Sequence, residues 1–233
     1  MLTVEAELEH LAIISWPVEA RKLAAMLPRP LVPQTIDRRN EWALVSMTLM
    51  RDTTVGSTYP QLNERAYVMR RDGTGKGAFF WRSYAATRQA LFVRSLLGFP
   101  EFVADLALDV RGASYVFRRN GRIVAKLDLG RSGRIPPEYR DLDMDRAARV
   151  SSNPMIGYTL NWGVLCATRV RHNRVKPRRV RVMRVDPSFM IPTVAIEPTA
   201  RRVPFLALYQ RRTPFWIDLP PRPIAVGSRA RAG

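Results

Sequence analysis

The chain has 233 residues, of which 46% are apolar and 25% charged. This composition is typical of an ordinary globular protein, excludes a disordered chain, and provides a sizeable core without disulfide bonds. Cys166 is the only cysteine, so an intrachain disulfide is impossible. The formal net charge is +18, and 34 of the 38 basic residues are arginines. Such a charge attracts anions but says nothing about the fold.

The sequence carries no signal for secretion or for a membrane span. Its N-terminal segment, MLTVEAELEH, is acidic and lacks the basic and apolar regions of a signal peptide. The most apolar window, residues 91–110, contains four charged side chains and is therefore not a transmembrane helix. We expect a cytoplasmic protein with no membrane partner.

In chain order, the first predicted elements are a strand over residues 11–16 and a helix over residues 18–27. Pro17 suits the first turn of a helix, and Pro28 and Pro30 prevent its continuation. A second strand is predicted over residues 42–50. One of its two faces is entirely apolar and is expected in the core: Ala43, Val45, Met47 and Leu49.

A hairpin is predicted next, with strands over residues 65–71 and 77–84 around the turn 72–75. Thr87 is a suitable N-cap for a helix that ends near Gly98. Further strands are expected over residues 102–110, 114–119 and 122–129, and Asn120-Gly121 is a strong turn signal between the last two.

The second half alternates polar segments with short apolar runs. Residues 130–152 are predicted to form a surface excursion with a short helix, followed by strands over 162–170, 176–185 and 203–210. Repeated prolines favour short strands over helices in this half. We expect one domain over residues 1–219 and a flexible Arg/Pro-rich tail over residues 220–233. The pattern as a whole predicts a mainly-β, α+β fold.

Two segments carry a resemblance to a known superfamily. Residues 63–68, NERAYV, lead through a hairpin and a short helix to the motif Gly98-Phe99-Pro100-Glu101-Phe102. Residues 11–31 combine a strand, Trp16, a short helix and the sequence LPRPL. The chain resembles the acetoacetate decarboxylase-like superfamily, nearest its DUF2071-like branch. The resemblance implies a cone-shaped closed β-barrel with an outer sheet and a few short helices, and a homo-oligomer.

The resemblance also shows what this chain lacks. In the decarboxylases the motif ends in two lysines, one of which forms a Schiff base with the substrate after its cationic neighbour lowers its pKa. This chain has Glu101 and Phe102 there, and Trp16 where the decarboxylases have an arginine. Lys126 is the only strand lysine that could substitute for the family's lysines, and we expect it on the solvent face. The sequence therefore argues against Schiff-base chemistry at the family position.

The candidate catalytic residues are Glu64 and Glu101. Glu64 shares a strand face with Ala66 and Val68, and by resemblance occupies the position of the family's active-site glutamate. Burial would raise its pKa and suit it to proton transfer. The alternative is a surface ion pair with a neighbouring arginine. Glu101 stands in the place of a family lysine, where it would act as an acid or base or pair with an arginine.

Four residues are expected to bind the substrate: Trp16, Arg65, Tyr67 and Phe99. Arg65 and Tyr67 match the Asn-x-Arg-x-Tyr-Val strand of the uncharacterised branch, in which the guanidinium would grip a carboxylate. A bracing role for Arg65 is equally open. No metal-ligand spacing or phosphate-binding loop is present, so we expect no metal and no cofactor.

The leading functional hypothesis is a protein that binds a small organic acid or keto compound in a barrel cavity. If it is an enzyme, of lyase or isomerase type, Glu64 would catalyse enolisation, hydration or cyclisation without a covalent intermediate. One alternative is a non-catalytic ligand-binding or scaffold protein of the same fold. Another is a nucleic-acid binder that uses the basic run 169–184, although no aromatic residues interleave there for base stacking.

Overall fold

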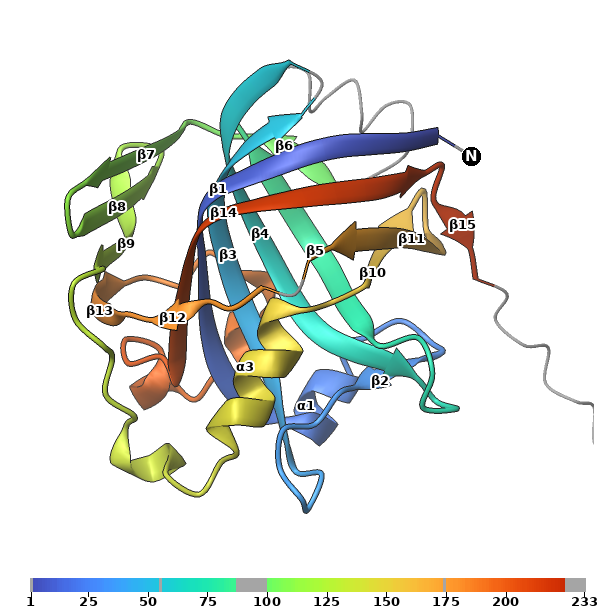
Figure 1. Ribbon diagram of the computed structural model, residues 1–233. Helices are drawn as coiled ribbons and strands as arrows, with labels where there is room; N and C mark the ends of the chain where they lie inside the picture. The colour runs from blue at the N-terminus through green and yellow to red at the C-terminus, as the bar shows by residue number, and fades with distance from the viewer. Residues whose placement is uncertain (1, 55, 87–99, 174, 225–233) are drawn as a thin grey trace, which may run out of the picture.

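The computed structural model describes residues 2–54, 56–86, 100–173 and 175–224 (Figure 1). Its largest sheet joins eleven strands. These strands are β1 (Leu2–Glu19), β2 (Leu31–Pro33), β3 (Trp42–Thr54), β4 (Ser57–Arg70), β5 (Gly77–Ala85), β6 (Glu101–Val103), β10 (Ile156–Asn161), β11 (Val164–His172), β12 (Arg178–Arg179), β14 (Leu206–Leu219) and β15 (Arg222–Pro223).

Seven of the described strands form a closed ring. Successive neighbours run β14-β1-β3-β4-β5-β10-β11, and β11 pairs with β14 to complete the circuit. All of these pairings are antiparallel except that of β10 with β5. Closure gives each long strand a partner on both sides along at least part of its length, which limits the edge that is open to other chains. This is the closed, mainly-β architecture that the sequence and its resemblance predicted.

A smaller sheet lies outside the ring, at the left of Figure 1. It has the order β13-β9-β8-β7 and consists of β7 (Leu106–Arg111), β8 (Ser114–Arg119), β9 (Arg122–Asp128) and β13 (Arg181–Val185). Its inner face buries Tyr115, Phe117 and Leu127 in the same apolar cluster as the ring strands. Asn120 and Gly121 have φ angles of 50° and 73°, as the predicted tight turn between β8 and β9 requires.

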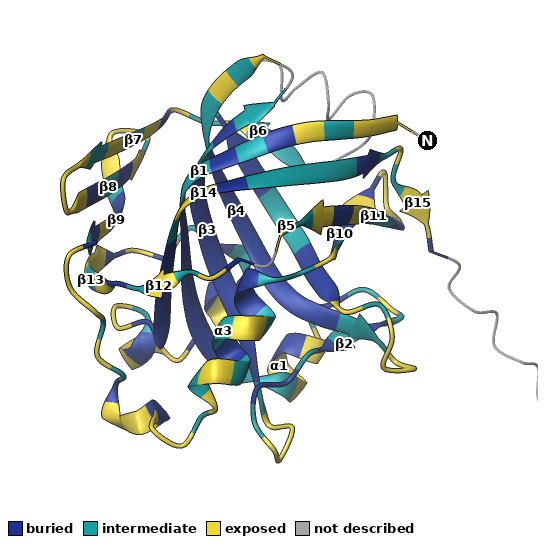
Figure 2. Ribbon diagram, in the orientation of Figure 1, coloured by how far each residue is buried: buried dark blue, intermediate teal, exposed yellow. Residues whose placement is uncertain are grey.

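Short helices cover one end of the ring. They are α1 (Ala20–Ala24), α3 (Met144–Ser152) and the 3-10 turns η1 (Pro137–Tyr139), η2 (Ile191–Ala195) and η3 (Pro198–Ala200). Asp143 caps α3 by accepting a hydrogen bond from the Arg146 N–H at 2.8 Å. Figure 2 shows that β3 and β4 are buried along most of their length, because the ring interior lies on one side of them and other elements cover the other.

The N-terminal prediction was wrong about where the strand ends. β1 continues through Pro17 to Glu19, and the helix is only Ala20–Ala24. β1 pairs with β3 as far as Glu19, but with β14 only as far as Ser15. Pro17 therefore lies beside a free edge, where its missing N–H breaks no ladder hydrogen bond.

Two predicted strands proved to be divided. Residues 102–110 contain the end of β6, which joins β5, and most of β7, which belongs to the outer sheet. Residues 176–185 likewise contain β12 and β13, which lie in different sheets. In residues 102–110 the alternation of apolar residues continues across the break, so it does not reveal where the chain passes from one sheet to the other.

A third prediction misplaced the start of β11. The predicted strand 162–170 begins only at Val164, because Trp162 and Gly163 form the turn with φ angles of 49° and 82°. β10 itself was not predicted. β14 extends to Leu219, well beyond the expected end at residue 210.

Other expectations agree with the structure. The strand over residues 42–50, the hairpin of β4 and β5 and the strand 114–119 are confirmed, as is a short helix within residues 130–152. The apolar face of β3 has no solvent exposure. The predicted helix from Thr87 to Gly98 lies outside the described residues. In the expected tail, Arg222–Pro223 pairs with β11.

Candidate functional site

The strand ring encloses a cavity of about 550 Å³. Its wall includes residues of β1, β3, β4, β5, β6, β10, β11 and β14, together with Ser152 at the end of α3. A pocket of this volume, mostly apolar with a few polar groups, is the usual form of a small-molecule site. In such a pocket the few polar groups fix the orientation of the ligand.

Strand alternation places a polar row on β3 and another on β4. Thr48, Asp52 and Thr54 of β3 face the cavity, and so do Tyr59, Gln61, Asn63 and Arg65 of β4. Because side chains alternate between the faces of a strand, the intervening residues point out of the ring. Asp52, Tyr59 and Gln61 were not predicted as site residues. The signal was present in the polar row of residues 48, 52 and 54.

Glu101 lies in the cavity wall at the start of β6. β6 runs parallel to β5, with Glu101 opposite Ser83, and the Ser83 N–H donates to the Pro100 carbonyl at 2.8 Å. Burial, followed by the nearby charge of Asp52, raises the pKa of Glu101 to about 7. A carboxyl group with such a pKa can both donate and accept a proton near neutral pH.

Asp52 is the second carboxyl group of the cavity. Its residue is 7% exposed, and burial raises its pKa to about 6, although a hydrogen bond from Thr54 Oγ1 to its Oδ1 at 2.5 Å acts in the opposite direction. Tyr59 lies opposite Asp52 in the pairing of β3 and β4. Burial and the charges of Asp52 and Glu101 raise the pKa of its phenol, which therefore remains protonated.

A chain of hydrogen bonds crosses the wall from β4 to β5. Gln61 Nε2 donates to Ser83 Oγ at 3.2 Å, and Ser83 Oγ donates to Asn63 Oδ1 at 2.7 Å. All three residues line the cavity. The Asn63 carbonyl oxygen is thus occupied, which leaves its amide nitrogen as the donor for a ligand.

Arg65 lies deeper along β4 and connects the cavity to α3. Its Nη2 donates to the carbonyl of Ser151 at 3.0 Å, and its Nε donates to the Tyr67 hydroxyl at 3.1 Å. A cation at the C-terminal end of a helix is favourable because the helix dipole is negative there. These bonds use Nε and Nη2, so Nη1 is the nitrogen that could bind a ligand. Arg65 therefore braces neighbouring elements, as one prediction had it, and it lies in the cavity wall, where the other prediction places ligand binding.

Three buried threonine hydroxyls of the cavity wall have no hydrogen-bond partner among the described residues: those of Thr48, Thr159 and Thr168. Their residues are at most 5% exposed. Buried hydroxyl groups are normally satisfied by protein or water. These three are consequently positioned to hydrogen-bond a ligand or ordered water.

His172 forms part of the opposite wall, on β11. Its ring stacks on Phe215 with centroids 5.2 Å apart. Nδ1 lies 2.8 Å from the carbonyl oxygen of Asn173, and Nε2 lies 3.3 Å from that of Pro154. Both ring nitrogens are thereby directed at backbone acceptors, so the ring is fixed in position.

Glu64 does not line this cavity. It lies on the outer face of β4, where it is fully buried and its Oε2 accepts a hydrogen bond from the Ile191 N–H at 2.8 Å. Burial raises its pKa, opposed by that hydrogen bond and by the nearby Arg82 and Arg119. The predicted burial and elevated pKa are both present, but the carboxyl group faces η2 instead of the barrel interior.

The other predicted substrate-binding residues are also separated from the cavity wall. Trp16 is fully buried, and its indole Nε1 donates to the Arg201 carbonyl at 3.1 Å. Tyr67 is fully buried and reaches the site only through its contact with Arg65. Phe99 lies outside the described residues. Of the six predicted residues, the structure brings Glu101 and Arg65 together in the cavity.

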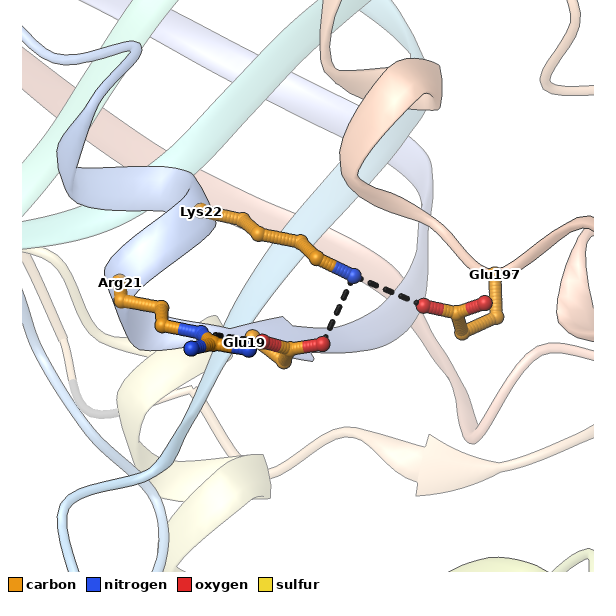
Figure 3. Close-up of polar contacts among 4 residues, drawn as sticks. All are labelled: Glu19, Arg21, Lys22 and Glu197. Atoms are coloured by element: carbon orange, nitrogen blue, oxygen red, sulfur yellow. Dashed lines mark hydrogen bonds and ion pairs between the residues drawn. The ribbon is translucent and has the colours of Figure 1, made fainter.

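All four lysines of the chain lie on the surface. Lys22, Lys76, Lys126 and Lys176 are exposed, and none lines the cavity. Figure 3 shows Lys22 between two carboxylates, with its Nζ 2.7 Å from Glu19 Oε1 and 3.0 Å from Glu197 Oε1. A Schiff base needs a lysine that reaches the substrate as a free amine. The cavity of this protein does not contain one.

The basic run of residues 169–184 makes several contacts within the molecule. Arg171 Nη2 lies 3.1 Å from Asp218 Oδ1, and Arg179 Nη2 donates to the Gly133 carbonyl at 2.7 Å. Arg178 lies over the ring of Tyr209. These three side chains therefore have structural partners. Among the described helices, none has the length and apolar character needed to cross a membrane.

Comparison with known proteins assigns the family. Residues 5–211 match the DUF2071 family, described as an uncharacterized conserved protein. The chain belongs to the DUF2071 family. The match covers almost the whole ring and its outer sheet. No protein with a curated description is similar enough in sequence to be matched.

Solved structures extend the likeness at the level of the fold. Acetoacetate decarboxylase from Legionella pneumophila has a TM-score of 0.60 and 14% identity, with 95% of this chain and 87% of that chain covered. An acetoacetate decarboxylase-like enzyme from Sphingomonas wittichii RW1 has a TM-score of 0.60 and 11% identity, covering 95% and 92%.

A third similar structure is the enduracididine biosynthesis enzyme MppR. With HEPES bound it has a TM-score of 0.58 and 10% identity, covering 97% of this chain and 89% of that chain. MppR complexed with pyruvate has a TM-score of 0.54. At these identities the comparisons establish a shared fold, the acetoacetate decarboxylase-like barrel.

Proposed function

We propose that this DUF2071 protein binds a small organic acid or keto compound in the barrel cavity and transfers a proton on it without a covalent bond to the protein. The observation that carries the proposal is Glu101. It lies in the cavity, where burial raises its pKa to about 7, and by the resemblance of its motif it stands in for a lysine of the decarboxylases. The fold is shared with MppR, which has been crystallised with pyruvate.

Four polar groups of the wall have roles in this proposal. Arg65 Nη1 binds the carboxylate of the ligand. Glu101 accepts the proton from the carbon next to the carbonyl group and later returns it. The Asn63 amide and the Tyr59 hydroxyl are the donors for the enolate oxygen that forms in between. Enolisation is the minimal reaction of this type, and hydration or cyclisation would use the same proton transfers.

Proton exchange on a keto acid tests the proposal. We expect the protein to accelerate exchange of the α-protons of 2-oxobutanoate in deuterated water, followed by proton NMR. Glu101→Gln should lower the rate about 10²-fold or more, because a general base contributes about 10²–10⁴-fold. Glu138→Gln, at an exposed glutamate, is the matched control and should leave the rate unchanged.

Trapping with borohydride separates this mechanism from the one used by the decarboxylases. The wild-type protein, incubated with pyruvate and borohydride, should show no mass increase, since none of its lysines reaches the cavity. A stable adduct, or an exchange rate that Glu101→Gln leaves unaltered, would contradict the proposal. Binding without exchange would leave a non-catalytic ligand-binding protein.

A further inference from the structure

The cavity has one mainly apolar wall. All the residues of β1 that line it are apolar: Val4, Ala6, Leu8, Leu11 and Ile13. A bulge between Glu9 and Ala12, where His10 has a φ of 53°, changes the alternation so that Leu8 and Leu11 face the same side. β14, which pairs with β1, adds Thr213, Phe215, Ile217 and Leu219. Thr213, opposite Leu8, is the one polar residue that these two strands contribute, and the rest of their surface is hydrocarbon.

The polar groups of β4 lie across the cavity from this wall. Around the seven-stranded ring β14 and β4 are three steps apart in one direction and four in the other, so they face one another. Each β4 residue in the cavity carries a polar group, as described above. The site thus has a mainly polar side on β3, β4 and β6 and a mainly apolar side on β1 and β14, while β10 and β11 add Thr159, Thr168 and His172.

The cavity is also much larger than a short keto acid. Pyruvate has six non-hydrogen atoms, and at about 30 Å³ for each water-sized group it would occupy roughly 180 Å³. The cavity measures about 550 Å³. The remaining space is adjacent to hydrocarbon, where water gains few hydrogen bonds. It has room for at most roughly twelve further carbon atoms at the same volume per atom.

The apolar wall becomes more exposed toward one end. Leu8, Leu11 and Ile13 are buried, whereas Val4, Ile217 and Leu219 are only half-buried. The cavity therefore opens at the N-terminal end of β1, and its apolar side continues to the opening. A ligand with its polar head near Arg65 and Glu101 would direct its other end along this wall.

We propose that the ligand of this cavity is an amphipathic keto acid, whose hydrocarbon tail of at most roughly twelve carbons lies against β1 and β14. The inference rests on the proposed function for the head group and adds the substrate class. The hydrophobic effect supplies the affinity for the tail, and the polar wall supplies the orientation.

A homologous series of ligands tests the tail. Dissociation constants of straight-chain 2-oxo acids with four to twelve carbons are measured by titration calorimetry below their micelle concentrations. Affinity should rise about fourfold for each added methylene, because each buried CH₂ contributes about 0.8 kcal/mol and 1.4 kcal/mol is tenfold. The rise should stop when the cavity is full. Equal dissociation constants for the short and the long acids would overturn the inference and leave the proposed function intact.

Matched 2-alkanones, which lack the carboxylate, separate the two proposals. If alkanones gain affinity with length and no 2-oxo acid binds, the apolar site is supported and the proposed head-group chemistry fails. If neither series binds more tightly with length, the tail site is refuted.

A cavity-filling variant locates the tail. Ala6 is 2% exposed and lines the cavity between Val4 and Leu8. Ala6→Phe should weaken binding of 2-oxodecanoate at least tenfold and change that of 2-oxobutanoate less than twofold. Ala107→Phe, at an exposed position of β7, is the control for a large residue on a strand. If Ala6→Phe fails to fold, Ala6→Val provides a smaller obstruction. It should again weaken binding of 2-oxodecanoate more than binding of 2-oxobutanoate. Equal effects on both acids would overturn the assignment.

Discussion

Glu101 and Asp52 are acids held in a cavity that solvates their charges poorly. Burial disfavours the ionised form of each and raises both pKa values, to about 7 and about 6. A group with a folded-state pKa above its unfolded value holds a proton that the unfolded chain releases. These carboxyl groups therefore cost stability as pH rises, in addition to any role they have in proton transfer.

The first prediction concerns the pH dependence of Glu101→Gln. The ordinary pKa of a glutamate is 4.5 and that of Glu101 about 7, so its ionisation destabilises the fold between these pH values and fully above pH 7. Glu101→Gln should raise the free energy of unfolding by about 1–3 kcal/mol at pH 8 and leave it nearly unchanged at pH 4.5. Urea denaturation at the two pH values measures this. An equal gain at both would show that burial of the charge is not the cause.

The second prediction separates Glu64 from the cavity. Glu64→Ala removes the acceptor for the Ile191 N–H and leaves a buried void, so it should cost about 2–4 kcal/mol of stability. Glu64→Gln keeps an oxygen acceptor and should cost less. Because Glu64 lies outside the cavity wall, Glu64→Gln should change α-proton exchange and ligand affinity less than threefold. A hundredfold loss of exchange at normal stability would restore Glu64 as a catalytic residue.

The sequence predicted part of the candidate site. Glu101 was recognised because it replaces a lysine in a motif, and Arg65 because it matches a strand pattern. Asp52 and Tyr59 were missed because each becomes part of the site only when β3 and β4 pair. Glu64 was placed correctly in a buried environment, but alternation along one strand does not tell which face is the inside of the ring.

At the scale of elements, the hairpin of β10 and β11 is the least extensively paired part of the ring. β10 contacts β5 through only two paired positions, Gly157 with Ala78 and Tyr158 with Phe79. β11 contacts β14 through three. β1 and β3, in contrast, are paired from residue 6 to residue 19. Cooperative stability of the ring should therefore be weakest at this hairpin.

The third prediction uses the turn of this hairpin. Trp162 has a φ of 49°, a left-handed conformation that costs energy for a residue with a side chain. The residue is 72% exposed, so burial of the indole does not offset this cost. Trp162→Asn should stabilise the protein by about 0.5–1 kcal/mol, since asparagine favours the first position of such turns. Thermal unfolding measures the gain. A loss of stability would show that the indole makes a contact that the turn geometry does not reveal.

Element boundaries could be predicted only where local chemistry determines them. Asn120-Gly121 identified its hairpin because both residues tolerate positive φ. Trp162-Gly163 forms the same type of turn, but a tryptophan gives no such signal, so β10 was missed. Pro17 was misassigned because its place at a free edge depends on where β14 begins, about 190 residues later.

At the scale of the whole molecule, the net charge of +18 affects stability directly. Like charges on a compact surface repel one another, and added salt screens them. The fourth prediction is that raising NaCl from 50 to 300 mM increases the melting temperature by about 2–6 °C, corresponding to roughly 1–2 kcal/mol. A melting temperature that falls with salt would mean that the ion pairs of the surface outweigh the repulsion.

The overall architecture was the most predictable property of the chain. Many short strands indicated a mainly-β fold, and the resemblance of residues 11–31 and 63–102 supplied the barrel. Ring closure itself could not be derived from local pattern, because β1 pairs with β14 across separations of up to 217 residues, from Leu2 to Leu219.

That pairing also determines when the protein can finish folding. β1 leaves the ribosome early, and the partner for one of its edges is made only near residue 219. During synthesis this edge remains available to other nascent chains. Glu5, Glu7 and Glu9 alternate along it, and charged side chains on a strand edge discourage such association. The glutamates of β1 in an otherwise basic protein are thus placed where charge protects a strand that must wait for its neighbour.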